Sequence, residues 1–129
     1  MSNKRKYIKV IPAIALMIAG MTSCKHDSFT VTPQISFSGD ILPVFRASCA
    51  INSNCHLGAN NTNKYTDLTD SVAYKTLTNK QLVLAGNPSA SLLYVQVSNK
   101  IMPKAPYSPL TADKITLIYN WIEQGAKNN

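Results

Sequence analysis

The chain has 129 residues, a formal net charge of +7 and 45% hydrophobic side chains. Four of its thirteen basic side chains lie within the first nine residues: Lys4, Arg5, Lys6 and Lys9. Without these four, nine basic and six acidic side chains remain, so the net charge falls to +3. That charge is ordinary for solubility and does not indicate binding to nucleic acid. The length allows one small domain rather than two.

An apolar run from Val10 to Met21 follows the basic residues. It is shorter than the roughly 20 residues that span a bilayer, and it has the length of a secretory signal core. The next residues, Met21-Thr22-Ser23-Cys24, resemble the lipobox of bacterial lipoproteins, with Met21 where leucine is usual. The resemblance implies a signal peptide at 1–23 and a lipid on Cys24 that attaches the protein to a membrane. An uncleaved anchor and a plain signal peptide are the alternatives.

Residues 24–36 contain few large apolar side chains and include Pro33, so we expect a tether there. A domain at 37–129 is expected to follow it. The apolar positions Ile41, Val44 and Phe45 share one helical face, and they predict a helix that Asp40 caps and that runs to about Ser48.

Three further helices are expected. A short helix should follow Asp70, and another should begin at Asn87 with Pro88 in its first turn and Leu92 on its buried side. The last should run from Thr111 to Gly125, a residue that suits the position just after a helix. About four short helices with long loops predict a small all-α domain.

The segment Cys49-Ala50-Ile51-Asn52-Ser53-Asn54-Cys55-His56 brings two thiols and an imidazole together. A cysteine pair with His after the second Cys is typical of covalently attached haem, but the usual motif has two intervening residues and this one has five. With Cys24 lipidated, Cys49 and Cys55 form the remaining pair. Haem thioethers and a disulfide are both chemically sensible for such a pair outside the cytoplasm. Zinc would have three ligands here and no obvious fourth.

Haem iron in electron-transfer proteins commonly takes His and Met as axial ligands. Three of the four methionines leave with the signal peptide, so Met102 remains. His26 lies in the expected tether, so His56 is the only histidine of the expected domain. Met102 lies in a loop stiffened by prolines, where a methionine that fills a gap in the core is not expected. His56 and Met102 are therefore the candidate axial pair.

The order of several short motifs along the chain carries a resemblance. Residues 41–45 lead into Cys49, and Cys55-His56 follows; further on come Ala85-Gly86-Asn87-Pro88 with Ser91-Leu92-Leu93, Met102-Pro103, Leu110-Thr111, and the ending Trp121-Ile122-Glu123-Gln124-Gly125-Ala126. This order resembles small c-type cytochrome domains of bacterial envelope proteins, particularly the planctomycete-type cytochrome c family. The resemblance covers about residues 37–127.

The resemblance implies haem c attached through Cys49 and Cys55, with His56 as proximal and Met102 as distal iron ligand. Trp121 and the aliphatic helix faces are expected to wall the haem. The implied function is one-electron transfer with redox partner proteins on the periplasmic or outer side of a bacterial cell envelope, without enzymatic catalysis. The five-residue gap leaves attachment through Cys55 alone open.

Two other functions stay open from the sequence. One is a cofactor-free lipoprotein stapled by a disulfide between Cys49 and Cys55, with a structural or binding role. The other is a haem domain in which Met102 does not bind iron, so that the iron has an open site for a gas ligand or for catalysis.

Overall fold

The computed structural model describes residues 32–58 and 66–129, and Thr32–Asn129 forms one compact unit. The expected signal peptide at 1–23, the lipidation site Cys24, His26 and the part of the tether before Thr32 lie outside the described residues. Within the described ranges, no helix is long and apolar enough to cross a membrane.

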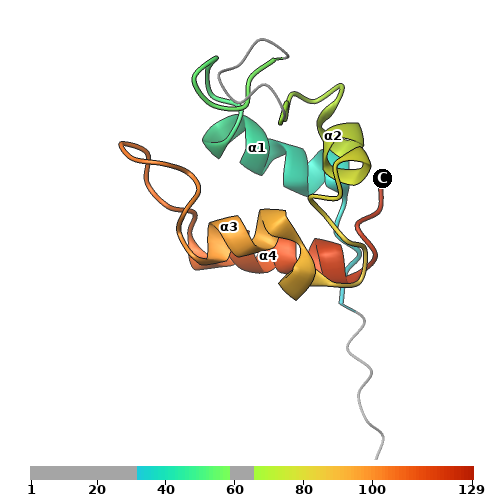
Figure 1. Ribbon diagram of the computed structural model, residues 1–129. Coiled ribbons are helices and arrows are strands. Elements are labelled where there is room, and N and C mark those ends of the chain that lie inside the picture. The colour runs from blue at the N-terminus through green and yellow to red at the C-terminus, as the bar shows by residue number, and fades with distance from the viewer. Residues whose placement is uncertain (1–31, 59–65) are drawn as a thin grey trace, which may run out of the picture. The chain divides into compact units, whose positions relative to one another are not determined.

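The described residues form four α-helices and no strand. The helices are α1 (Leu42–Ser48), α2 (Ala73–Asn79), α3 (Leu92–Ser98) and α4 (Ala112–Glu123). A π-helical turn, η1 (Phe37–Ile41), precedes α1, and a 3₁₀ turn, η2 (Pro88–Ala90), precedes α3. Helices α3 and α4 lie side by side, and the long loop between them projects from one end of the pair (Figure 1). The predicted small all-α fold with short helices and long loops is confirmed.

The first helical segment begins earlier than predicted, because Ser36 rather than Asp40 caps it. The Ser36 hydroxyl accepts a hydrogen bond from the Gly39 N–H at 3.0 Å, and the Asp40 carboxylate accepts one from the Ser36 N–H at 2.8 Å. This reciprocal arrangement satisfies two of the N–H groups that a helix start leaves without partners. The expectation that Asp40 is the capping residue was therefore wrong.

Aromatic side chains form the centre of the core. The ring centroid of Phe37 lies 6.2 Å from the ring centroid of Phe45 and 5.3 Å from the ring centroids of Tyr74 and Trp121. Trp121 is 1% exposed, and its indole N–H donates to the Lys127 carbonyl at 3.0 Å. A buried indole needs such an acceptor, so both the ring and the N–H of Trp121 are used within this core.

Residues 33–38 pack against the end of α4. The Gln124 side chain accepts a hydrogen bond from the Ile35 N–H at 2.8 Å and donates one to the Pro33 carbonyl at 3.1 Å. Asn129 accepts from the Phe37 N–H at 2.9 Å. The described unit thus includes residues 33–36, a stretch that was expected to belong to the tether.

A turn before α3 joins that helix to the rest of the domain. The Ser91 hydroxyl accepts from the Leu84 N–H at 2.9 Å and donates to the Asn87 carbonyl at 2.8 Å. The Asn87 side chain accepts a hydrogen bond from the Ala90 N–H at 3.2 Å. Gly86, which has a positive φ of 72°, donates its N–H to the Ile122 carbonyl at 2.8 Å. Asn87 therefore caps the short turn η2 and not a continuous helix. The motif residues Gly86, Asn87 and Ser91 thus stabilise the fold.

Replacing the fully buried Ser91 by alanine should lower the free energy of unfolding by about 1–3 kcal/mol, because the Leu84 N–H loses its acceptor. Urea unfolding of the full chain measures this. The matched control is Ser89→Ala in the same turn, where an exposed serine should cost less than about 0.5 kcal/mol. Equal losses for the two variants would contradict the assigned role of Ser91.

Candidate functional site

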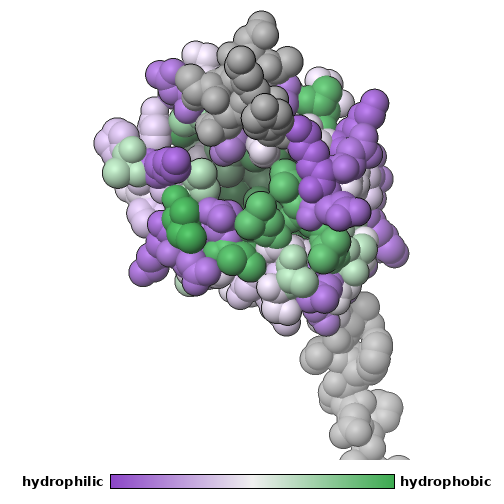
Figure 2. Space-filling model, in the orientation of Figure 1, coloured by the Kyte–Doolittle hydropathy of each residue, from purple (hydrophilic) through white to green (hydrophobic). Residues whose placement is uncertain are grey.

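The four residues predicted to bind haem all line one pocket. Its volume is about 640 Å³, within the roughly 300–1,000 Å³ that is typical of small-molecule and cofactor sites. Figure 2 shows it as a hollow bordered by hydrophobic side chains. The structure thus brings together Cys49, Cys55, His56 and Met102, although the first and last of these are 53 positions apart.

Six of the nineteen described residues that line the pocket are leucine or valine. They come from the segment before α2, from α2 itself, from the turn after it and from α3: Leu68, Leu77, Leu82, Leu92, Leu93 and Val97. Leu92 is 46% exposed, so it was wrongly placed on the buried side of its helix. It lines the pocket instead, where an apolar ligand would cover it. Such a hollow is suited to a large apolar cofactor.

The expected position of Trp121 against a cofactor is wrong. Among the described residues, none that lines this pocket comes from α4. Trp121 packs on Phe37 in the aromatic core instead. The apolar stripe of α4 therefore stabilises the fold, while α2, α3 and the segments flanking α2 supply the apolar wall of the pocket.

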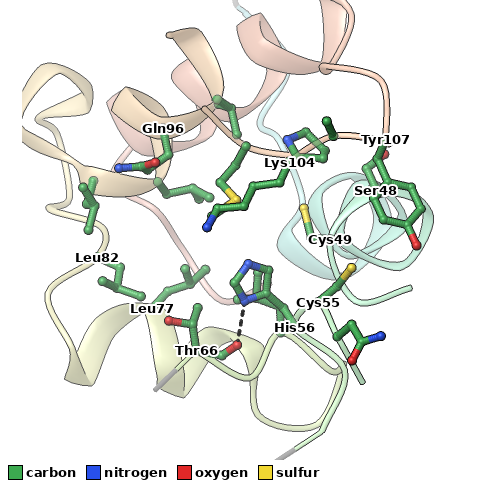
Figure 3. Close-up of a pocket in the computed structure, with 18 of the residues that line it drawn as sticks. Ser48, Cys49, Cys55, His56, Thr66, Leu77, Leu82, Gln96, Lys104 and Tyr107 are labelled. Carbon is green, nitrogen blue, oxygen red and sulfur yellow. Dashed lines mark hydrogen bonds between the residues drawn. The ribbon is translucent and has the colours of Figure 1, made fainter. Parts of the chain in front are cut away.

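The orientation of His56 is fixed by a main-chain carbonyl. Its Nδ1 lies 2.9 Å from the Thr66 carbonyl oxygen (Figure 3). A carbonyl can only accept, so Nδ1 carries the proton of the neutral ring and Nε2 holds the lone pair. Proteins commonly orient a metal-binding histidine by such a bond from the other ring nitrogen. The bond thus selects, for the neutral ring, the tautomer whose Nε2 can bind a metal ion.

The five residues between the cysteines fold into a compact loop whose ends meet. The His56 N–H donates to the Cys49 carbonyl at 3.1 Å, which closes the loop. Within it, the Asn52 carbonyl accepts from the Cys55 N–H at 3.0 Å, and the Asn52 side chain accepts from the Asn54 N–H at 2.9 Å. Cys49 and Cys55 both line the pocket (Figure 3), and no disulfide joins them. The long gap therefore does not keep the two cysteines from one site.

Burial raises the pKa of the Cys49 thiol from 9.0 to about 11, with a further increase from the nearby charge of Cys55 and an opposing effect of Lys114. The thiol is therefore protonated at neutral pH. A thiol in this state is a poor nucleophile, because the thiolate is the reactive form.

This shift predicts a pH-dependent stability for the chain with both thiols reduced and unmodified. The unfolded chain loses the Cys49 proton near pH 9.0 and the folded chain near pH 11, so stability is full below pH 9 and falls as the pH rises to 11. The loss should be on the order of 2–3 kcal/mol. Urea unfolding at a series of pH values measures it. Cys49→Ser should lack this component, and an identical pH dependence in that variant would refute it.

Met102 is held in the pocket by the end of α3. The N–H groups of Ile101 and Met102 both donate to the Gln96 carbonyl, at 3.0 and 3.1 Å. The following residues, 103–107, also line the pocket, and the Lys104 side chain extends into it (Figure 3). The thioether of Met102 and the imidazole of His56 thus reach one cavity from two separate loops.

Sequence reasoning missed the groups that orient these side chains. Thr66 and Gln96 act through main-chain carbonyls, which leave no trace in the residue type. Lys104 and Tyr107 belong to the proline-rich loop, and that loop was singled out only for its methionine. The described residues contain no group of three or more His, Cys, Asp or Glu side chains arranged to hold a metal ion, so the zinc alternative gains no support.

Comparison with known proteins finds no family model, no curated protein and no solved structure that matches this chain. Its function is therefore inferred from the residues of the pocket and their geometry.

Proposed function

We propose that this chain is a lipid-anchored, single-haem c-type cytochrome domain that transfers single electrons in a bacterial cell envelope. The observation that carries the proposal is the pocket itself. It combines an imidazole oriented through its Nδ1, a thioether and two thiols with a wall of six leucine and valine side chains. This set of donors matches the chemistry of covalently bound haem.

Each of the four residues has a role under this proposal. Cys49 and Cys55 would hold haem c through thioether bonds, and His56 and Met102 would supply the protein ligands to its iron. The cofactor supplies the one-electron redox chemistry, while the chain supplies ligands, burial and orientation. A methionine ligand raises the reduction potential, since thioether sulfur favours ferrous iron. The closed loop from Cys49 to His56 supports attachment through both cysteines.

The test is covalent haem on the full chain. The protein is expressed in a bacterial host that matures c-type cytochromes, and the membrane fraction is examined by a haem-stained denaturing gel and by reduced absorbance spectra. The proposal expects a stained band and the spectrum of low-spin haem c. Colourless protein with a Cys49–Cys55 disulfide in its peptide map would overturn it in favour of the cofactor-free lipoprotein.

Lipidation of Cys24 is tested separately. Cys24→Ala should move the protein from the membrane fraction to the soluble fraction, because a lipid chain contributes about 0.8 kcal/mol of membrane affinity for each buried CH₂ group. Fractionation with detection by haem stain or immunoblot measures this, and unmodified Cys24 in the mass spectrum of the wild-type protein would also count against the lipid. Retention of Cys24→Ala in the membrane would indicate an uncleaved anchor.

A further inference from the structure

A hydrogen bond joins the two loops that carry the proposed haem-binding side chains. The Asn52 side-chain amide donates to the Tyr107 hydroxyl at 2.8 Å, across 55 positions of sequence. Asn52 is the third of the five residues between Cys49 and Cys55. Tyr107 lies five residues after Met102 and lines the same pocket. The bond thus connects the cysteine side of the pocket with the methionine side.

Both partners of this bond are held by their own loops. The side-chain oxygen of Asn52 accepts from the Asn54 N–H at 2.9 Å, so the amide nitrogen is left to face Tyr107. The Asn52 carbonyl also accepts from the N–H groups of Cys55 and Leu57, at 3.0 and 3.3 Å. On the other side, the Tyr107 N–H donates to the Lys104 carbonyl at 3.0 Å. A substitution of Asn52 or Tyr107 therefore affects the hydrogen-bonded turn that contains that residue.

We propose that Asn52 and Tyr107 are positioning residues that hold the Met102 loop closed against the loop of the two cysteines. This inference rests on the proposed function. It assigns a role to the unusual gap in the cysteine motif, because Asn52 is one of the residues in that gap. The longer gap supplies the contact that keeps the methionine in place.

The expected consequence concerns the methionine ligand. A thioether is a neutral, weak ligand, so its binding to iron depends on how firmly its loop is held. Tyr107→Phe keeps the ring and removes only the hydroxyl. The fraction of iron without Met102 should rise about two- to tenfold, the change expected for the loss of one hydrogen bond.

Imidazole is the probe, because it binds ferric haem in competition with Met102. The apparent affinity of the full-length haem protein for imidazole should rise about two- to tenfold in Tyr107→Phe. Tyr119→Phe is the matched control, since the two tyrosines are similarly exposed, at 38% and 40%, and Tyr119 does not line the pocket. Asn52→Asp in the chain with Tyr107 intact should keep wild-type affinity, because it keeps the acceptor for the Asn54 N–H and can accept from the Tyr107 hydroxyl. Equal imidazole affinity in wild type, Tyr107→Phe and Tyr119→Phe would overturn the inference.

If the proposed function is wrong, the wild-type chain carries no covalent haem. That result differs from an unchanged imidazole affinity in the variants, which would overturn only the inference about the two loops. The contact between the loops is then tested on that haem-free chain by amide hydrogen exchange. In Tyr107→Phe, the exchange rates of the amides of Cys55 and residue 107 should rise about two- to tenfold relative to Tyr119→Phe. Both N–H groups are hydrogen-bonded within the two turns. Unchanged exchange at both amides would refute the role of the contact even without haem.

Discussion

A chain with His56 replaced by alanine should carry at least about tenfold less covalent haem than the wild-type chain when both are expressed in a host that matures c-type cytochromes. Nδ1 of His56 is hydrogen-bonded to the Thr66 carbonyl, so in the neutral ring Nε2 carries the lone pair that can bind a metal ion in the pocket. Alanine removes both the ligand and that bond. Haem per protein, from the haem-stained band and from absorbance after denaturation, measures the effect.

The control for His56→Ala is His26→Ala, which removes the other histidine of the chain. This variant should keep the wild-type haem content and spectrum, since His26 precedes the described domain. Wild-type haem content in His56→Ala would show that another residue takes the proximal role. A loss in both variants would point to a general effect on expression or maturation.

The second large effect is expected at Met102. Met102→Ala should convert ferric iron from low to high spin and lower the reduction potential by an amount on the order of tenths of a volt, because axial ligands tune haem potentials over about 0.8 V. Absorbance and a redox titration measure the two changes. Haem attachment itself should persist, since Cys49, Cys55 and His56 are unchanged.

Ile101→Ala is the matched control for Met102→Ala. Ile101 is the preceding residue of the same loop, is 49% exposed, and does not line the pocket. Its replacement should leave the spin state and the potential at their wild-type values. An unchanged spectrum in Met102→Ala would refute methionine ligation and favour an iron with an open site for a gas ligand or for catalysis.

The candidate donors could be predicted because their residue types are rare in this chain. Outside the expected signal peptide the chain contains one methionine, and the expected domain contains one histidine. The helices were predictable for a different reason, since the spacing of apolar residues and the residues that end a helix act locally. The apolar spacing of α4 and the glycine after it, Gly125 with a φ of 97°, gave its position closely.

What could not be predicted depends on contacts between distant segments. Helical periodicity marks an apolar face but does not say whether that face meets another helix or a pocket. Leu92 was therefore assigned to the core and Trp121 to the cofactor, whereas Leu92 lines the pocket and Trp121 is buried in the core. The Thr66 carbonyl that orients His56 and the hydrogen bond from Asn52 to Tyr107 also depend on tertiary structure.

The contacts of Gln124 with Pro33 and Ile35 would limit how far the domain could move from a membrane if Cys24 carries the proposed lipid. With a lipid on Cys24 as proposed, only the nine peptide steps from Cys24 to Pro33 lie between the lipid and a residue that is bonded to the domain. Fully extended, this stretch reaches about 30 Å, whereas a tether that extended to residue 36 would reach about 40 Å. Under the proposed function, the shorter tether would confine the search for a redox partner to a thinner layer above the membrane and so raise the partner's effective concentration.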